Sequence, residues 1–322
     1  MSEKAKKGCE VLLLTCAEAK PGEKVLVITD DKSFAIGNIM YDCAKAYTDT
    51  TLICTEPRAT HGSAPTDAVA AAMKSADVIF SATTFSLFNT TARIEACKAG
   101  ARFVNMADYS VAMLEAGCLF VDFARTRSLV EATAARITGK VCTITTPAGT
   151  NLTASIEGRK AVSGFGMANK PGMAASPPDI ETAVGPTDGG ADGVLVIDGS
   201  IPLPGLGVLK EPVRIRVEKG CIADIAGGAE AKLLDESLKA MNDPRVYRVG
   251  EIGFGMNTGA GISGRMLEDE GVYGTLHIGI GNNLSYGGTN DTPIHIDLIM
   301  KSPTYTVDGR VVCKDGEYTD SE

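Results

Sequence analysis

The sequence predicts two domains: an α/β domain with a parallel sheet over residues 1–138, and a mixed α+β domain rich in antiparallel strands over residues 139–322. Three observations support this prediction. A chain of 322 residues is comfortably long for two domains. Its first part alternates short apolar runs with helical segments of roughly 10 to 15 residues. Most of its glycines follow residue 139, where turns separate short strands.

The first domain contains four short apolar runs that are typical of buried parallel strands. They occupy residues 25–29, 51–54, 77–80 and 102–105. Helical segments are expected over residues 8–19, 33–47, 65–74 and 89–99. This alternation favours right-handed crossover connections. The loop after the first strand, residues 30–33, has no GxGxxG and no Walker lysine, and its two carboxylates would repel a pyrophosphate, so no dinucleotide site is expected.

The second domain begins after a predicted helix over residues 126–136 and a strand over residues 140–145. Further strands are expected over residues 193–197 and 213–217, and one helix over residues 230–241. The Asp-Gly pairs at 308–309 and 315–316 have the composition of hairpin turns. The pattern therefore predicts mainly antiparallel pairing.

Composition excludes several classes of function. The net charge is −9 and the basic residues do not cluster, so no nucleic-acid partner is expected. The nine cysteines are odd in number and form no CxxC pair, which indicates reduced thiols and a cytoplasmic location. No run approaches the roughly 18 apolar residues of a membrane span, and no secretory signal is visible.

His295 and Asp297 are candidate metal ligands. If their segment is a strand, a period of two places both on one face and the apolar Ile296 and Leu298 on the other. His277 stands in a matching alternation. A lone histidine between apolar neighbours is more often a hydrogen-bonded core residue, but two such histidines, one with a neighbouring aspartate, favour a divalent metal.

Two glutamates are weaker candidates. Glu251 opens an apolar, glycine-rich stretch over residues 250–257, where a carboxylate is costly unless it is paired or bound to metal. Glu181 is less informative by itself because Asp179 flanks it. The acidic run at residues 268–270, taken alone, is typical of a solvated surface.

A polar, glycine-rich loop separates the two histidines. Loops of this composition often surround a substrate. Tyr286 in this loop is a candidate for an additional ligand or an oxyanion donor, and equally for an ordinary loop tyrosine.

These segments resemble the metal-dependent leucyl aminopeptidases of the aminopeptidase T family, most specifically over residues 250–300 and more weakly around Glu181 and residues 146–153. The resemblance implies one or two divalent ions (Zn, Co or Mn), catalytic roles for some of these residues, and a homodimer. The implied ligands are Glu181, Glu251, His277, His295 and Asp297. The implied catalytic residues are Glu251, Glu270 and Tyr286.

Two activities remain open from the sequence. The main expectation is a hydrolase that cleaves an N-terminal amino acid or a related small amide, with a metal-activated water and Glu270 moving the proton. The same fold also carries dihydroxypyridine ring-cleaving dioxygenases of similar length. This alternative places one Fe(II) on His277, His295 and Asp297. A third possibility is a module that binds a small molecule or a metal without catalysis.

Overall fold

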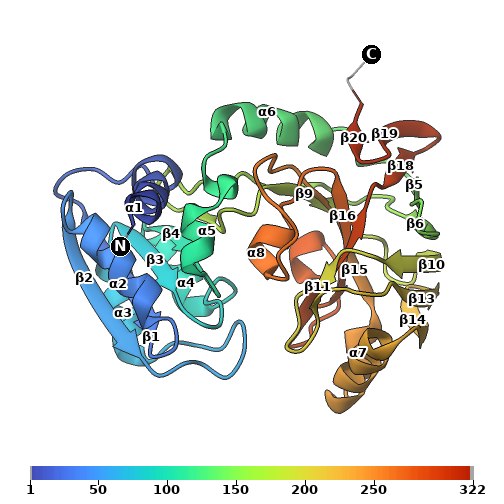
Figure 1. Ribbon diagram of the computed structural model, residues 1–322, viewed down its shortest axis with the longest axis horizontal. Helices are drawn as coiled ribbons and strands as arrows, with labels where there is room; N and C mark the ends of the chain where they lie inside the picture. The colour runs from blue at the N-terminus through green and yellow to red at the C-terminus, as the bar shows by residue number, and fades with distance from the viewer. Residues whose placement is uncertain (1, 320–322) are drawn as a thin grey trace. The chain divides into compact units, whose positions relative to one another are not determined.

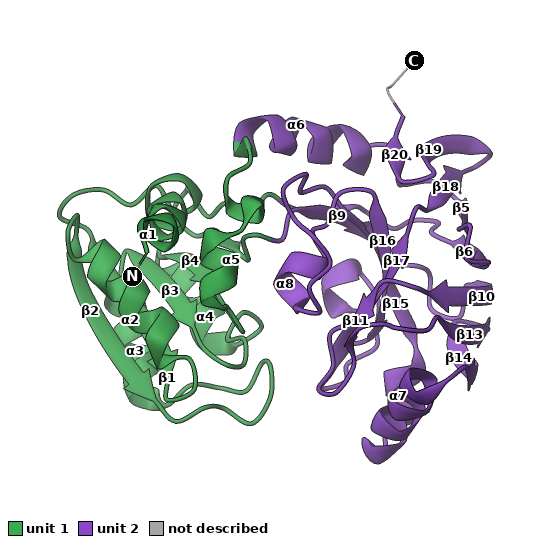
Figure 2. Cartoon of the chain, in the orientation of Figure 1, with its two compact units in different colours: residues 1–123, 165–178 green, residues 124–164, 179–322 purple. Residues whose placement is uncertain are grey.

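The computed structural model describes residues 2–319. The chain folds into two compact units (Figure 2). The first unit comprises residues 1–123 and 165–178, and the second comprises residues 124–164 and 179–322. The sequence-based boundary after residue 138 differs from this division. The segment 165–178 returns to the first unit because its strand β8 (Ala174–Ala175) pairs with β4 (Arg102–Asn105).

The first unit is built on a five-stranded parallel sheet with the order β2-β1-β3-β4-β8 (Figure 1). Its other strands are β1 (Lys24–Asp30), β2 (Asp49–Thr55) and β3 (Val78–Ala82). Its helices are α1 (Glu3–Glu10), η1 (Val11–Cys16), α2 (Phe34–Ala44), α3 (Asp67–Ser75), α4 (Thr91–Lys98), α5 (Val111–Glu115) and η2 (Gly117–Leu119). The predicted parallel sheet is confirmed.

The first helix differs from its prediction. It begins at Glu3 because the Ser2 side chain caps it by accepting a hydrogen bond from the Ala5 N–H, and it ends as a π-helix at Cys16. Every cysteine of the chain is a free thiol, as expected. Within residues 2–319, no helix is both long enough and apolar enough to cross a bilayer.

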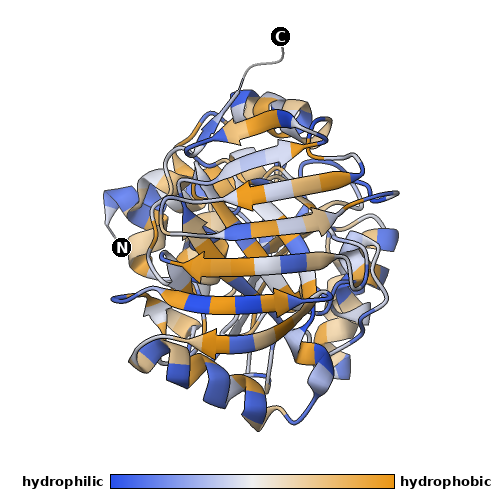
Figure 3. Ribbon diagram, turned by 90° about the vertical axis from the view of Figure 1, so that its right-hand side faces the viewer, coloured by the Kyte–Doolittle hydropathy of each residue, from blue (hydrophilic) through white to orange (hydrophobic). Residues whose placement is uncertain are grey.

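The second unit contains two larger antiparallel sheets and the small hairpin β11–β12, which confirms the predicted fold class. The eight-stranded sheet has the order β14-β13-β10-β6-β5-β18-β19-β20, and hydrophilic and hydrophobic residues alternate along its strands (Figure 3). Its strands are β5 (Val141–Thr145), β6 (Asn151–Ser155), β10 (Ala191–Ile197), β13 (Val213–Glu218), β14 (Cys221–Ala226), β18 (Thr304–Val307), β19 (Arg310–Lys314) and β20 (Glu317–Tyr318).

The five-stranded sheet has the order β17-β16-β15-β9-β7. Its strands are β7 (Val162–Gly164), β9 (Glu181–Val184), β15 (Val249–Gly255), β16 (Thr275–Gly281) and β17 (His295–Lys301). The remaining elements of the unit are α6 (Phe123–Ala134), β11 (Ser200–Ile201), β12 (Gly207–Val208), α7 (Ala229–Ala240), η3 (Pro244–Tyr247), α8 (Met266–Asp269) and η4 (Leu284–Tyr286).

The two faces of this five-stranded sheet have opposite chemistry. Glu251, Gly279 and Asp297 are directly opposed across three neighbouring strands, and residues that oppose one another share a face. Residues at alternate positions join them on that face. This face, called the ligand face below, carries Glu181, Glu251, Gly253, Gly255, His277, Gly279, Gly281, His295 and Asp297. The other face is buried and apolar, with Ile252, Phe254, Leu276, Ile278, Ile280, Ile296, Leu298 and Met300.

A β-bulge in β15 determines which side Glu251 faces. Val249 of β15 opposes Ile280 of β16, and Glu251 opposes Gly279. Between these two pairs β15 advances by two residues, whereas β16 advances by only one. Gly250 is the extra residue. The bulge therefore lets Val249 point to the apolar side while Glu251 points to the ligand face, although two residues of a regular strand separated in this way would share a side.

Candidate metal centre

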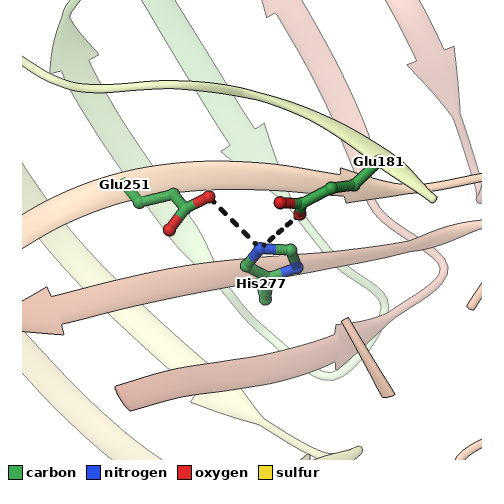
Figure 4. A group of neighbouring side chains, drawn as sticks. All are labelled: Glu181, Glu251 and His277. Atoms are coloured by element: carbon green, nitrogen blue, oxygen red, sulfur yellow. Dashed lines mark ion pairs between the residues drawn. The ribbon is translucent and has the colours of Figure 1, made fainter. Parts of the chain in front are cut away.

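The first group of potential ligands comes from three adjacent strands (Figure 4). His277 Nε2 lies 3.1 Å from Glu181 Oε2 and 3.6 Å from Glu251 Oε1. His277 and Glu251 are each 1% exposed, so the expectation that Glu251 is buried is confirmed. One ligand atom from each of the three residues lies within 4.8 Å of the others.

A second group shares Glu251 with the first. His295 Nε2 lies 2.7 Å from Glu251 Oε2 and 3.3 Å from Asp297 Oδ1. The other ring nitrogen, His295 Nδ1, donates a hydrogen bond of 2.7 Å to the Asn282 carbonyl oxygen. This hydrogen bond orients the ring and leaves Nε2 as the atom available to an ion.

The donor atoms of both groups are incompletely satisfied. Glu181 Oε2, Glu251 Oε1, Asp297 Oδ1 and His277 Nδ1 are buried and find no hydrogen-bond partner among the described residues. Buried carboxylates without partners are costly. A divalent cation would compensate them, and oxygen and imidazole donors suit Fe(II), Mn(II) and Zn(II). The residues present therefore fit a metal ion.

The two histidines fall in different groups of ligand atoms, whereas the expected ferrous site contains both. Within residues 2–319, each group of mutually close ligand atoms contains one imidazole and two carboxylates. The expected set of His277, His295 and Asp297 is not among them: His277 groups with Glu181 and Glu251, and His295 groups with Glu251 and Asp297.

Glycines on the ligand face make room for these side chains. A Cβ atom added at Gly253 would lie 2.0 Å from His277 Nε2. A Cβ atom at Gly279 would lie 2.8 Å from Glu251 Oε2 and 2.7 Å from His295 Cε1. The glycine-rich composition of these strands is therefore a requirement of the site, because any larger residue would displace a ligand.

Two further carboxyl groups belong to the cluster. Glu270, which follows α8, hydrogen-bonds with Asp297, and burial followed by the charges of Asp297 and Asp179 raises its pKa well above the usual value. Burial and the charge of Glu181 likewise raise the pKa of Asp179. Sequence reasoning missed Asp179, which lies two residues before β9 begins at Glu181.

The same charges act on the imidazoles. Burial alone would lower the pKa of His277, but the adjacent carboxylates of Glu181 and Glu251 outweigh it and raise the pKa well above the usual value. Burial would also lower the pKa of His295, but Asp297 raises it. In the absence of an ion, both rings therefore bind a proton more readily than a free imidazole does.

Tyr286 lies at this centre. Its ring stacks on that of His295, with the ring centroids 5.7 Å apart and the planes 26° from parallel. Burial, followed by the charge of Glu251, raises the pKa of its hydroxyl well above the usual value. The structure thus brings Glu270 and Tyr286 to the predicted ligands.

The acidic run at residues 268–270 is not a solvated surface. Asp269 is fully buried and accepts hydrogen bonds from the backbone N–H groups of Ser263 and Gly264 and from the Ser200 hydroxyl. Glu268 is 7% exposed. These contacts fix the short helix that carries Glu270 into the centre.

Comparisons with known proteins separate the two activities left open by the sequence. The family model of 2,5-dihydroxypyridine 5,6-dioxygenase (NicX) matches residues 9–320. A 2,5-dihydroxypyridine 5,6-dioxygenase of Pseudomonas putida KT2440 is 31% identical over 180 residues. These residues are 53% of this chain and 51% of that protein, so the aligned region spans about half the length of the curated relative.

Two solved structures share the fold. The first is the structure of the 2,5-dihydroxypyridine dioxygenase from Pseudomonas putida KT2440, with a TM-score of 0.83 and 22% identity. The superposition includes 100% of this chain and 99% of that protein. AmpT from Thermus thermophilus matches 98% of this chain and 99% of its own, with a TM-score of 0.71 and 15% identity.

These findings correct the main expectation. The predicted assignment to the aminopeptidase T family and the predicted hydrolase activity are wrong, because the matching family is that of the dioxygenases. The resemblance reflected a shared fold, which AmpT confirms. Fold and donor types are common to both classes and do not determine the reaction.

Proposed function

The chain belongs to the 2,5-dihydroxypyridine 5,6-dioxygenase family, and from this premise we propose that it is a metal-dependent dioxygenase that opens the ring of a dihydroxypyridine-like substrate. The observation that carries the proposal is the group of the buried Glu251 and Asp297 and the partly buried His295, whose donor atoms converge on one face of a sheet. Without a cation there, two buried carboxylates would share a single imidazole.

Under this proposal Glu251, His295 and Asp297 hold Fe(II), and His277 and Glu181, which adjoin them through the shared Glu251, are its further donors. When bound, ferrous iron supplies the one-electron chemistry that lets O₂ react with an electron-rich ring. The protein contributes binding, orientation and proton handling.

Each neighbouring group has a defined task in this proposal. Burial and the charges of Asp297 and Asp179 raise the pKa of Glu270 well above its usual value, which favours a proton held beside Asp297. That proton is available to an oxygen of the substrate or product. Tyr286 excludes water from one face of the His295 ring and limits how a flat substrate approaches.

Oxygen uptake with a defined metal load tests the proposal. Metal-free protein is loaded under argon with Fe(II) or, separately, with Zn(II), Mn(II) or Co(II), and mixed with 2,5-dihydroxypyridine in oxygenated buffer. We expect one O₂ consumed per ring lost, with iron only. The proposed activity is refuted if the protein retains iron but consumes no oxygen with 2,5-dihydroxypyridine or with other hydroxylated pyridines.

Ligand variants provide the controls. His295→Ala and Asp297→Ala should lose metal and activity while the circular dichroism spectrum of the folded chain persists. The site is a small part of a large buried core, so its loss leaves the fold intact. If either variant keeps its iron and its rate, the ligand assignment is wrong.

A further inference from the structure

The loop between the two histidines, residues 282–292 (the inter-histidine loop), contacts the metal centre at two points. Its Tyr286 ring stacks on His295, and its Asn282 carbonyl oxygen accepts the hydrogen bond from His295 Nδ1. Any displacement of this loop therefore changes the orientation of a ligand and the access to it.

Asp188, in the loop after β9, connects to both ends of the turn that presents Tyr286. Asp188 Oδ1 accepts a hydrogen bond of 3.1 Å from Asn283 Nδ2, and Oδ2 accepts one of 2.7 Å from Thr289 Oγ1. Asn283 and Thr289 lie on either side of Tyr286 in sequence. A single carboxylate thus closes the turn from outside.

The ionisation of Asp188 is secured by its surroundings. Arg159 Nη2 lies 3.7 Å from Asp188 Oδ1, and the two side chains are only 14% and 28% exposed. Burial would raise the pKa of Asp188, but the bonds from Thr289 and Asn283 and the Arg159 charge lower it. Hydrogen bonds to an ionised acceptor are roughly twice as strong as neutral ones.

The inter-histidine loop also rests directly on the backbone near β9. A Cβ atom added at Gly185 would lie 2.5 Å from the Tyr286 carbonyl oxygen and 2.9 Å from Tyr286 Cβ. At Gly287, whose φ is +77°, an added Cβ would lie 3.2 Å from Arg159 Nη1. Both glycines permit a close approach that larger residues would prevent.

We propose that Asp188 is a positioning residue: it holds the inter-histidine loop closed, with Tyr286 on His295, so that retention of the ion and binding of a flat aromatic substrate depend on it. The hydrogen bonds and the ion pair given for Asp188 involve Asn283, Thr289 and Arg159, none of which is a proposed ligand. It acts through Asn283 and Thr289. The substrate part of this inference rests on the proposed function, whereas the loop and ion parts do not.

The test compares Asp188→Ala, Asp188→Asn and Asp192→Ala with the unchanged protein. Asp192 is the matched control, because its Oδ1 also accepts a backbone hydrogen bond, from the Lys219 N–H, and among the described residues no hydrogen bond or ion pair joins it to residues 282–292. The measurements are amide hydrogen exchange of residues 282–292 with and without Fe(II), the rate of iron release to a chelator, and KM and kcat.

Asp188→Ala should speed exchange in the loop and iron release by roughly tenfold or more, since two charge-assisted hydrogen bonds are lost. KM should rise more than kcat falls. Asp188→Asn keeps one acceptor oxygen, so its loop exchange and iron release should be slower than those of Asp188→Ala. A general loss of folding would not be relieved by this conservative substitution. Asp192→Ala should match the unchanged protein.

The proposal is overturned if Asp188→Ala leaves loop exchange and iron release at their original rates, or if Asp192→Ala changes them equally. If the unchanged protein consumes no oxygen but Asp188→Ala still loosens the loop and releases iron faster, the proposed function fails and the positioning role stands. The two claims are therefore separable.

Discussion

Replacing Gly253 by alanine tests whether the glycine-lined ligand face is required for ion binding. The new Cβ atom would lie 2.0 Å from His277 Nε2, whereas ordinary contacts begin at 3.4 Å. The ring must therefore retreat by about 1.4 Å, and it is enclosed by packed neighbours. Metal–ligand distances hold only within about 0.2 Å, so His277 would be lost as a donor.

The expected result is a fall in affinity for the ion by roughly 10- to 100-fold, the range seen when support of a ligand is lost. Calorimetric titration of the metal-free protein with Mn(II) measures it, together with elemental analysis after dialysis. Circular dichroism and thermal unfolding of the metal-free variant establish that the chain still folds.

Gly261→Ala is the matched control for this experiment. A Cβ atom at Gly261 meets no atom within 4 Å in the part of the chain described, and its φ is not in the left-handed region. It should bind the ion as the unchanged protein does. If Gly253→Ala also binds the ion with unchanged affinity, His277 does not contribute to the site and the geometric reasoning is refuted.

Three further outcomes are expected. Fe(II) or Mn(II) at about 100 times its dissociation constant should stabilise the protein by about 2.7 kcal/mol, visible in thermal unfolding as a rise of about 4 °C that a chelator reverses; no shift with any divalent ion would contradict a metal site. Because the pKa values of His277 and His295 are raised in the metal-free protein, their protonation stabilises that form below an unfolded pKa of about 6.5, and this contribution disappears as pH rises through the raised values. Ion binding needs neutral imidazoles, so affinity should increase with pH above about 6.5 with proton release, and a flat profile in calorimetry would argue against these ligands. His61→Ala should leave the metal content unchanged, because His61 lies in the first unit and its Nδ1 accepts the Ser86 N–H.

Much of the fold and of the ligand set could be predicted from periodicity. In β17, apolar Ile296 and Leu298 alternate with His295 and Asp297, and this alternation was sufficient to place the two potential ligands on one face. The hairpin turns Asp308-Gly309 and Asp315-Gly316 were recognisable because both residues of each pair adopt positive φ, which their composition tolerates.

Other features of the fold and the site depend on contacts between distant segments, which the alternation of residues along one strand does not reveal. The bulge at Gly250, which sends Val249 and Glu251 to different sides, is determined by the partner strand β16. The burial of Asp269 depends on donors from Ser200, far away in sequence. The reaction itself was predicted wrongly because carboxylate and imidazole donors serve peptidases and dioxygenases alike, so the donor types do not distinguish the two activities.

The potential ligands come from four strands, with Glu181 and Asp297 at the two ends in sequence. In an unfolded chain these groups are separated by long loops, whose closure must precede any chelation. The ion can therefore bind only after β9, β15, β16 and β17 have paired. Metal should accordingly slow unfolding while leaving the refolding rate nearly unchanged, so a chelator would shorten the lifetime of the native protein without impairing its formation.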